Sequence, residues 1–239
     1  GAGEPLVLLH GFGSCAADMW APFLEPLAAR YRLIVPELRG HGRSTNPSGV
    51  YTHRQTASDV LALLDTLGVG RFKAIGVSSG GMTLLHAATR DPGRVEALVL
   101  VGTTTYFPEQ ARAIMREVSI ETMPPFLREM YDTCAVRGQE QVRQLVAQFR
   151  GFKDSYDDMT FTPPHLATIT ARTLIVHGDR DEFFPVAIPV EMYTAIPGSQ
   201  LWIVPNGDHV PIYGERTPEF LRVTRQFLAA AEGTKPPAK

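Results

Sequence analysis

Cysteine is scarce in this chain of 239 residues, which contains only Cys15 and Cys134. The two lie far apart and match no metal-ligand spacing. A disulfide between them is compatible with the sequence, but free thiols in a cytoplasmic protein are the simpler interpretation, because cytosolic proteins rarely carry disulfides. The seven histidines form no His-Glu-x-x-His motif and no Cys/His pairing, so we predict no metal site.

Long apolar runs and an excess of one charge sign are also missing. The longest apolar runs, such as 98–101 and 174–176, are strand-sized and far below the ~20 residues of a membrane span. The formal net charge of −2 predicts neither a nucleic-acid partner nor binding to an anionic membrane surface. The start shows no signal-peptide pattern and leaves open whether a segment precedes Gly1. Length and composition predict one large globular domain.

Short apolar runs alternate with longer amphipathic segments along the chain. Each run is nearly continuous in hydrophobicity, as strands are when both faces of their sheet are covered. The alternation predicts an α/β fold class, with a mostly parallel central sheet and helices on both faces. We expect strands at Leu6–Leu9, Arg32–Val35, Phe72–Val77, Ala97–Val101, Thr173–Val176 and Gln200–Val204, and helices at His53–Leu67, Gly81–Arg90 and Arg216–Ala231.

The stretch from about Thr103 to Leu166 breaks this alternation. It contains helical patterns at 109–118, 125–136 and 139–149 but no convincing strand. Because it is too long for a single crossover, we predict a helical cap at 103–166, inserted after the strand that ends near Val101. Segments 1–102 and 167–232 then form the core. The polar, proline-rich tail 233–239 is expected to be disordered.

A Gly-x-Ser-x-Gly motif, Gly76 to Gly80, stands between a predicted strand and a predicted helix. Such a sharp strand-to-helix turn exposes the serine hydroxyl in a strained backbone conformation. The helix start adds positive potential where negative charge develops on a substrate. The pattern selects Ser78 as a nucleophile. Ser79 is the weaker alternative, because a motif centred on it would lack its first glycine.

A serine nucleophile needs a base within hydrogen-bond reach, and the base needs an orienting group. Two later strands each lead into a cluster that could supply them, at 177–181 and at 206–211. The carboxyl ends of parallel strands meet at one edge of the sheet, where ligands bind. We therefore expect Ser78 as nucleophile, His209 as base and Asp181 as acid to meet there despite their separation in sequence.

These motifs together resemble the α/β-hydrolase superfamily over nearly the whole chain. The matching segments are His10–Gly13, Arg39–Ser44, Gly76–Gly81, His177–Asp181 and Gly207–His209. The resemblance implies the α/β-hydrolase fold, a serine–acid–histidine triad and an oxyanion hole formed by the backbone N–H groups of Phe12 and Ser79. Its His-Gly-x-x-Asp pattern selects Asp181 over Asp179, which remains the weaker alternative.

The chemistry implied is acyl transfer to water through an acyl-enzyme, with no cofactor. A serine at this position disfavours haloalkane dehalogenases and the related epoxide hydrolases, which use aspartate there. Our first prediction is a carboxylesterase that cleaves a small carboxylic ester, the broadest class consistent with the triad. The alternatives are a lactonase, a carbon–carbon bond hydrolase of a ring-cleavage product, a cofactor-free perhydrolase, or a ligand sensor that retains the triad.

Residues that would bind the small-molecule substrate are less sharply defined. Bulky side chains that could line an acyl pocket, or pack in the core or cap, are Trp20, Phe107, Phe126, Met130 and Phe184. A carboxylated substrate would need a cation, for which the predicted cap offers Arg112, Arg116, Arg128, Arg137 and Arg143. None of these arginines stands out from an ordinary solvated helix face. The oligomeric state is left open.

Overall fold

A sheet of six parallel strands, in the order β2-β1-β3-β4-β5-β6, lies at the centre of the computed structural model, which describes residues 1–230. The strands are β1 (Glu4–Leu9), β2 (Tyr31–Ile34), β3 (Phe72–Val77), β4 (Val95–Val101), β5 (Arg172–Gly178) and β6 (Gln200–Val204). Each coincides with a predicted strand, and the parallel pairing confirms the predicted fold class. The tail predicted to be disordered, 233–239, lies outside the described residues.

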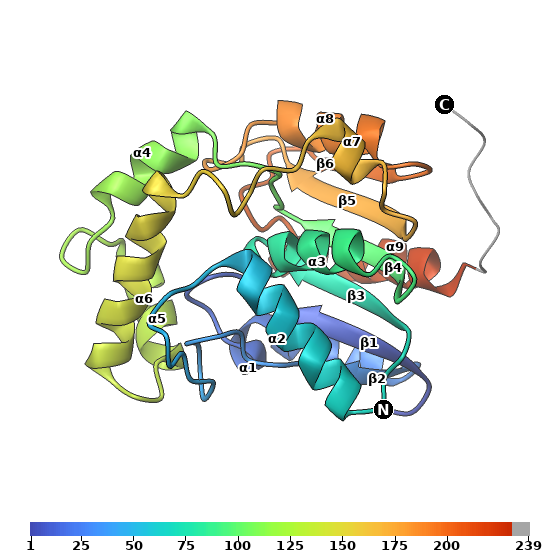
Figure 1. Ribbon diagram of the computed structural model, residues 1–239, viewed down its shortest axis with the longest axis horizontal. Helices are drawn as coiled ribbons and strands as arrows, with labels where there is room; N and C mark the ends of the chain where they lie inside the picture. The colour runs from blue at the N-terminus through green and yellow to red at the C-terminus, as the bar shows by residue number, and fades with distance from the viewer. Residues whose placement is uncertain (231–239) are drawn as a thin grey trace.

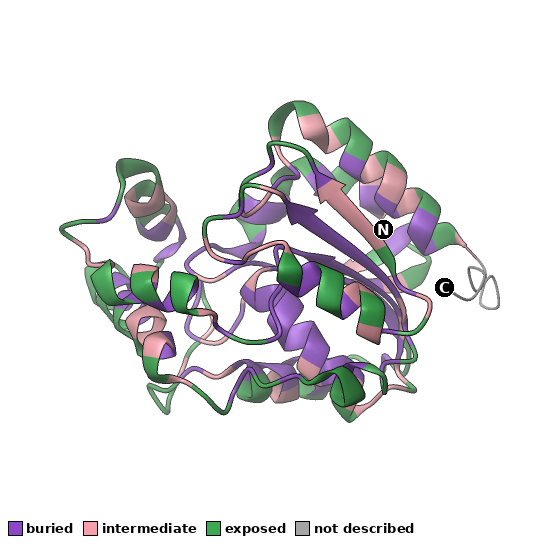
Figure 2. Cartoon of the chain, turned by 90° about the horizontal axis from the view of Figure 1, so that it is seen from above, coloured by how far each residue is buried: buried purple, intermediate pink, exposed green. Residues whose placement is uncertain are grey.

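The central strands β1, β3, β4 and β5 are almost wholly buried, whereas the edge strands β2 and β6 are partly exposed (Figure 2). In β1, Leu6 and Leu8 pack into the core on one face, while Val7 and Leu9 pack into the core on the other. Successive side chains of a strand point to opposite faces, so a continuous apolar run serves both cores at once. Each fully buried side chain of this size contributes about 1.5–3 kcal/mol.

Helices cover both faces of the sheet (Figure 1). Side chains of α1 and α9 share the core that contains Leu6, and those of α2, α3 and α8 share the core that contains Val7. The bounds are α1 (Ala16–Ala28), α2 (His53–Thr66), α3 (Ser79–Arg90), α8 (Ala187–Ala195) and α9 (Thr217–Ala229), with a 3-10 helix η2 (Gly214–Arg216) before α9. In this described part of the chain, no helix has the length and apolarity to cross a membrane.

Helix α1 was not predicted, and its prolines explain why. Pro22 and Pro26 lie inside the helix, where each removes a backbone donor and masks the helical pattern. Tertiary packing compensates, because Trp20 and Phe23 are completely buried and lie edge to face, with ring centroids 5.9 Å apart. Trp20 is therefore a core residue on the buried face of α1.

The 103–166 segment contains no strand among its residues, all of which the structure describes. Its elements are α4 (Glu109–Glu117), α5 (Pro125–Cys134), α6 (Gln139–Gly151), the 3-10 helix η1 (Phe152–Asp154) and α7 (Pro163–Leu166). Helices α4, α5 and α6 stand together beyond the carboxyl ends of the strands (Figure 1). They have a small core of their own, formed by Met123, Tyr131, Ala135, Val142, Leu145 and Val146.

The prediction of free thiols is wrong. Cys15, directly before α1, and Cys134, the last residue of α5, form a disulfide with Cα atoms 5.4 Å apart. No local pattern marks this pair, because 119 positions separate the two cysteines. The bond links the loop after β1 to the 103–166 segment. Since disulfides are rare in cytosolic proteins, it weakens the argument for a cytoplasmic location, which stays a prediction.

Candidate active site

Ser78 lies at the sharp turn between β3 and α3, with φ of 50° and ψ of −115°. This left-handed conformation costs a non-glycine residue of order 1–3 kcal/mol. Two backbone hydrogen bonds hold it, because the Ser78 N–H donates to the Val101 carbonyl and the Ser78 carbonyl accepts from Met82. The turn is so tight that a Cβ on Gly76 would come within 2.6 Å of the Gly80 backbone. The strained backbone of Ser78 and the absence of a side chain at Gly76 are therefore both needed to form the turn that carries the hydroxyl.

The side chain of His209 bridges Ser78 and Asp181. Its Nε2 lies 3.0 Å from Ser78 Oγ, and its Nδ1 lies 2.9 Å from Asp181 Oδ2. Asp181 follows β5 and His209 follows β6, so three separate strand ends supply the group. A carboxylate only accepts hydrogen bonds, so Asp181 holds the proton on Nδ1 and leaves Nε2 as the acceptor for the Ser78 hydroxyl.

Asp181 is ionised although it is buried. Burial raises the pKa of its carboxyl, but the hydrogen bonds from His209 and from the N–H of Phe184 favour the ionised form, and the pKa is lowered overall. Its Oδ1 accepts the N–H groups of Phe183 and Phe184 at 2.8 and 3.0 Å. In the described structure, His209 contacts Asp181 and not the alternative Asp179.

The two amides expected to stabilise an oxyanion also lie beside Ser78. Phe12 is in the loop after β1, where a Cβ on the preceding Gly11 would lie 3.6 Å from Ser78 Cβ. Ser79 is the first residue of α3, so its N–H has no acceptor within that helix. Neither the Phe12 nor the Ser79 amide donates to another described residue. Both therefore remain available to a ligand.

A cavity of about 170 Å³ opens on these groups. Its wall is mainly apolar, and the predicted pocket residues Phe107, Met130 and Phe184 belong to it. The other two candidates do not, because Trp20 is in the core and the Phe126 side chain is 69% exposed. The polar residues in the wall are Ser14, Ser78, Ser79, Tyr131 and His209. The wall contains no lysine, arginine, aspartate or glutamate within the described residues.

None of the five candidate arginines lines this cavity. The Arg112 guanidinium is buried and donates to the main-chain carbonyls of Phe107, Phe152, Lys153 and Ser155. The other four are engaged as Arg116–Glu109, Arg128–Asp132 and Arg143–Glu140 pairs, with Arg137 on the carbonyls of Gly40 and Gly42. Arg112 thus ties α4 to η1 and Arg137 ties the segment to the core, whereas the other three arginines pair within their own helices.

The side chain of Ser79 does not face His209. Its Oγ lies 3.0 Å from Nε2 of His53, whose Nδ1 lies 2.7 Å from Asp158 Oδ2. Sequence analysis missed both His53 and Asp158. The one available signal was the position of His53, which stands four residues before Ala57 on the buried face of α2.

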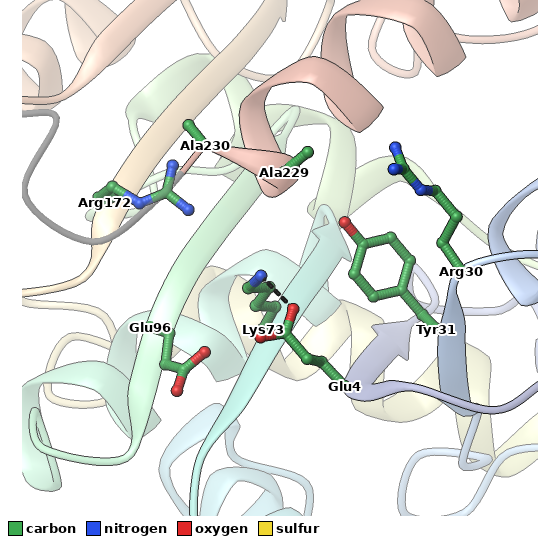
Figure 3. A pocket seen from close by; sticks show the side chains of 8 residues that line it. All are labelled: Glu4, Arg30, Tyr31, Lys73, Glu96, Arg172, Ala229 and Ala230. Carbon is green, nitrogen blue, oxygen red and sulfur yellow. Dashed lines mark hydrogen bonds and ion pairs between the residues drawn. The ribbon is translucent and has the colours of Figure 1, made fainter.

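A larger hollow, of about 470 Å³, lies at the opposite edge of the sheet (Figure 3). Its wall comes from the amino-terminal parts of the strands and from the end of α9. In Figure 3 the Lys73 ammonium points at the Glu4 carboxylate, 2.6 Å away. Lys73 also donates to the carbonyl of Leu228, so its charge is already engaged. The side chains that line this hollow include no serine, cysteine or histidine, and it is not the candidate site.

Comparison with known proteins identifies the family. Residues 4–131, just over half of the chain, match the family model described as the alpha/beta hydrolase fold. The 2-hydroxy-6-oxo-2,4-heptadienoate hydrolase of Pseudomonas putida is 28% identical, with 97% of this chain and 91% of the relative aligned. The 2-hydroxymuconate semialdehyde hydrolase of Pseudomonas putida is 27% identical, with 97% and 89% aligned.

Two solved structures extend the comparison. A variant of the meta-cleavage product hydrolase from Pseudomonas fluorescens IP01 has a TM-score of 0.80 at 22% identity, covering 95% of this chain and 91% of that one. An N-acyl homoserine lactone degrading enzyme has a TM-score of 0.73 at 27% identity, covering 95% and 94%. By sequence match and by its six-stranded parallel sheet, this chain belongs to the α/β-hydrolase fold family.

Proposed function

We propose that this chain is a serine-dependent hydrolase in which Ser78 is the nucleophile, His209 the base and Asp181 the acid that orients the base. The contacts of 3.0 Å to Ser78 and 2.9 Å to Asp181 on the two nitrogens of one imidazole support the proposal. A base must lie within hydrogen-bond reach of the proton it removes, and this one does. The strained backbone at Ser78 supports it as well, because such strain concentrates at reacting groups.

The proposed reaction has two stages. Ser78 Oγ attacks a carbonyl carbon as His209 takes its proton, and the carbonyl oxygen becomes an oxyanion held by the Phe12 and Ser79 amides. The tetrahedral intermediate collapses, and the leaving group departs with the proton from His209. Water then attacks the acyl-enzyme with His209 again as base, which releases the acid and restores the Ser78 hydroxyl.

The cavity favours a compact, uncharged substrate. A buried carboxylate is costly unless a cation or several hydrogen bonds compensate it, and residues 1–230 supply no lysine or arginine to the wall. The volume of about 170 Å³ is small for a ligand pocket and close to that of a cavity that accepts one benzene ring. A lactone folds its acyl and alcohol parts into one ring, so it fits this space better than an extended ester.

We therefore propose a lactonase, one of the alternatives raised by the sequence, in place of a general carboxylesterase. One structural neighbour at 27% identity is named as a lactone-degrading enzyme and another at 27% as an esterase, so the preference for a lactonase rests on the size of the cavity. The 103–166 segment would act as a cap, because Phe107, Met115, Tyr131 and Phe149 from this segment all line the cavity.

A carbon–carbon bond hydrolase is the second candidate. It is favoured by the names of the relatives, which at 27–28% identity are hydrolases of heptadienoate and muconate semialdehyde compounds. Those substrates carry a carboxylate, and the described side chains that line this cavity include no cation for it. For this reason we place the lactonase first.

The test compares purified wild type with Ser78→Ala on γ- and δ-lactones, short p-nitrophenyl esters and a 2-hydroxy-6-oxodienoate. We expect the wild type to open lactones fastest, and Ser78→Ala to lose roughly 10³–10⁶-fold in turnover. Ser48→Ala, which removes an exposed loop hydroxyl, is the matched control and should retain wild-type rates. Equal turnover by Ser78→Ala would contradict the serine mechanism. Faster turnover of the dienoate would favour the second candidate, and binding without turnover would favour a sensor.

A further inference from the structure

Ser79 has a histidine and an aspartate of its own. His53 Nε2 lies 3.0 Å from Ser79 Oγ, and His53 Nδ1 lies 2.7 Å from Asp158 Oδ2. The side chains of Ser79, His53 and Asp158 are all buried, and His53 has no exposed surface. One residue further along the chain, this arrangement repeats the contacts that His209 and Asp181 make with Ser78. The proposed reaction uses Ser78, His209 and Asp181 and gives no role to the side chains of Ser79, His53 and Asp158.

The direction of the hydrogen bonds follows from Asp158. Burial raises the pKa of its carboxyl, but the hydrogen bond from the His53 side chain and those from the N–H groups of His53 and Arg54 favour the ionised form, and the pKa is lowered to about 2. The ionised carboxylate accepts the Nδ1 proton of His53, which leaves Nε2 as an acceptor. The Ser79 hydroxyl therefore donates to His53.

His53 cannot move away from Ser79 easily. Its ring centroid lies 5.4 Å from that of Tyr51 and 5.2 Å from that of Phe152, so aromatic rings confine it. Asp158 in turn is held by the backbone N–H groups of His53 and Arg54, at 2.7 and 3.1 Å. The Ser79 side chain is thus fixed from outside its own helix.

The Ser79 N–H lies in the peptide plane that runs from Ser78 Cα to Ser79 Cα. The carbonyl of this plane accepts from the Met82 N–H, which holds one side of it. A restraint on the Ser79 side chain holds Ser79 Cα, the far end of the same plane. We propose that His53 and Asp158 are positioning residues that hold the Ser79 N–H in line with the oxyanion formed at Ser78. This inference rests on the proposed function, because it assumes that Ser78 reacts and that the Ser79 amide stabilises the product of attack.

The geometry favours this role over a second nucleophile. The Ser79 hydroxyl points to the buried His53, whereas Ser78, Phe12 and His209 line one cavity together. A nucleophile at Ser79 would have to react away from these three residues. Asp158 also belongs to the 103–166 segment, so the oxyanion donor is held in part by the segment that covers the cavity.

Labelling with an alkyl fluorophosphonate tests the proposal without a known substrate. Ser78 Oγ attacks phosphorus, the O–P bond forms as the P–F bond breaks, fluoride leaves and His209 takes the proton. In the transition state the phosphoryl oxygen gains negative charge, which the same two amides would stabilise. We expect Ser79→Ala and His53→Phe each to label about 10-fold more slowly, less than the ~10²–10³-fold loss of a whole donor, because the N–H remains but is misaligned.

Three comparisons separate positioning from a structural effect. His53→Gln should recover most of the rate, because its amide can accept from Ser79 and donate to Asp158. The double variant Ser79→Ala/His53→Phe should be no slower than the slower single variant, because both remove one hydrogen bond. His165→Phe is the matched control: the exposed His165 ring packs against Phe161 and, among the described residues, makes no hydrogen bond or ion pair with Ser79, His53 or Asp158, so this variant should label at the wild-type rate.

The outcomes distinguish this proposal from the proposed function. If the wild type labels on Ser78 while Ser79→Ala and His53→Phe label equally fast, the positioning role is wrong and the nucleophile stands. If His165→Phe slows labelling as much as His53→Phe does, the loss is not specific to the contacts of His53 and Asp158, and positioning is overturned. If peptide mapping finds the label on Ser79, or none on Ser78, the proposed function itself fails.

Discussion

His41 Nε2 accepts a hydrogen bond from the Gly13 N–H at 3.0 Å, although 28 residues separate the two in sequence. The contact holds the loop that carries Phe12. His10 supports a neighbouring loop in the same way, since its Nε2 accepts from the Leu38 N–H at 3.0 Å. Because each Nε2 is an acceptor, each imidazole must be neutral to make its bond.

These two histidines predict a loss of stability in mild acid. Burial lowers the pKa of His10 to about 4 and that of His41 to about 3, from an ordinary value of 6.5. Below pH 6.5 the two imidazoles are protonated in the unfolded chain but stay neutral in the folded chain. The free energy of unfolding therefore falls as the pH drops. We expect about 1.4 kcal/mol per pH unit for each histidine between pH 6.5 and 4.

Urea unfolding at a series of pH values between 7 and 5 measures this slope. His41→Gln removes one titrating group while its amide oxygen can still accept from Gly13. Its slope should be shallower by about 1.4 kcal/mol per pH unit, even if the variant is less stable at pH 7. A free energy of unfolding that stays level between pH 6.5 and 5 would contradict the prediction.

Replacement of Asp181 by asparagine should show how far catalysis depends on the carboxylate that accepts the His209 Nδ1 proton. Asp181 accepts the Nδ1 proton of His209, whereas an amide can present an N–H there and favour the wrong imidazole tautomer. We expect Asp181→Asn to fold and to lose about 10⁴-fold in kcat on the best substrate. Steady-state kinetics measures the loss. Asp179→Asn is the matched control and should stay close to wild type; the reverse order would move the acid role to Asp179.

The disulfide predicts that reduction weakens the fold. Joining Cys15 to Cys134 closes a loop with a sequence separation of 119 residues, which restricts the unfolded chain. We expect the Cys15→Ser/Cys134→Ser variant to lose about 2–5 kcal/mol in the free energy of unfolding. Denaturant titration of oxidised wild type and variant measures the difference. Two thiols that react with a thiol reagent in unreduced, denatured wild type would show that the bond does not form.

Much of the fold was predictable because its signals are local. The runs 72–77 and 200–204 are strands over those same residues, since a buried parallel strand needs only a short continuous apolar stretch. The turn at Ser78 was predictable from the glycines around it. The grouping of Ser78, Asp181 and His209 followed from topology, because parallel strands bring their carboxyl ends to one edge.

What the sequence did not reveal depends on contacts between distant segments. His53 and Asp158 lie 105 residues apart, and nothing local to either residue indicates the other. The same holds for the disulfide. Arg112 looked like a candidate ligand for a carboxylate, but its donors are used by carbonyls of its own segment, which only the packed structure shows. The type of a residue indicates which interactions its side chain can make, but not which residue it will contact in the folded chain.

Ser14 predicts a specific contribution to substrate binding. Its side chain is buried and lines the cavity, yet Oγ has no hydrogen-bond partner within the described residues. An unpaired buried hydroxyl costs about 1–3 kcal/mol, which a polar atom of the substrate would recover on binding. We expect Ser14→Ala to raise KM by about 5–10-fold, equivalent to about 1 kcal/mol, with little change in kcat because the contact is made equally before and during reaction.

The matched control for Ser14 is Thr224 in α9. Its Oγ1 is also buried without a described partner, but Thr224 does not line the cavity. Both Ser14→Ala and Thr224→Val remove an unpaired hydroxyl, so neither should lower the free energy of unfolding by more than about 1 kcal/mol. Only Ser14→Ala should change KM. If the two variants have the same KM as wild type, the Ser14 hydroxyl does not bind substrate. Selection among substrates must then come from the shape of the apolar wall alone.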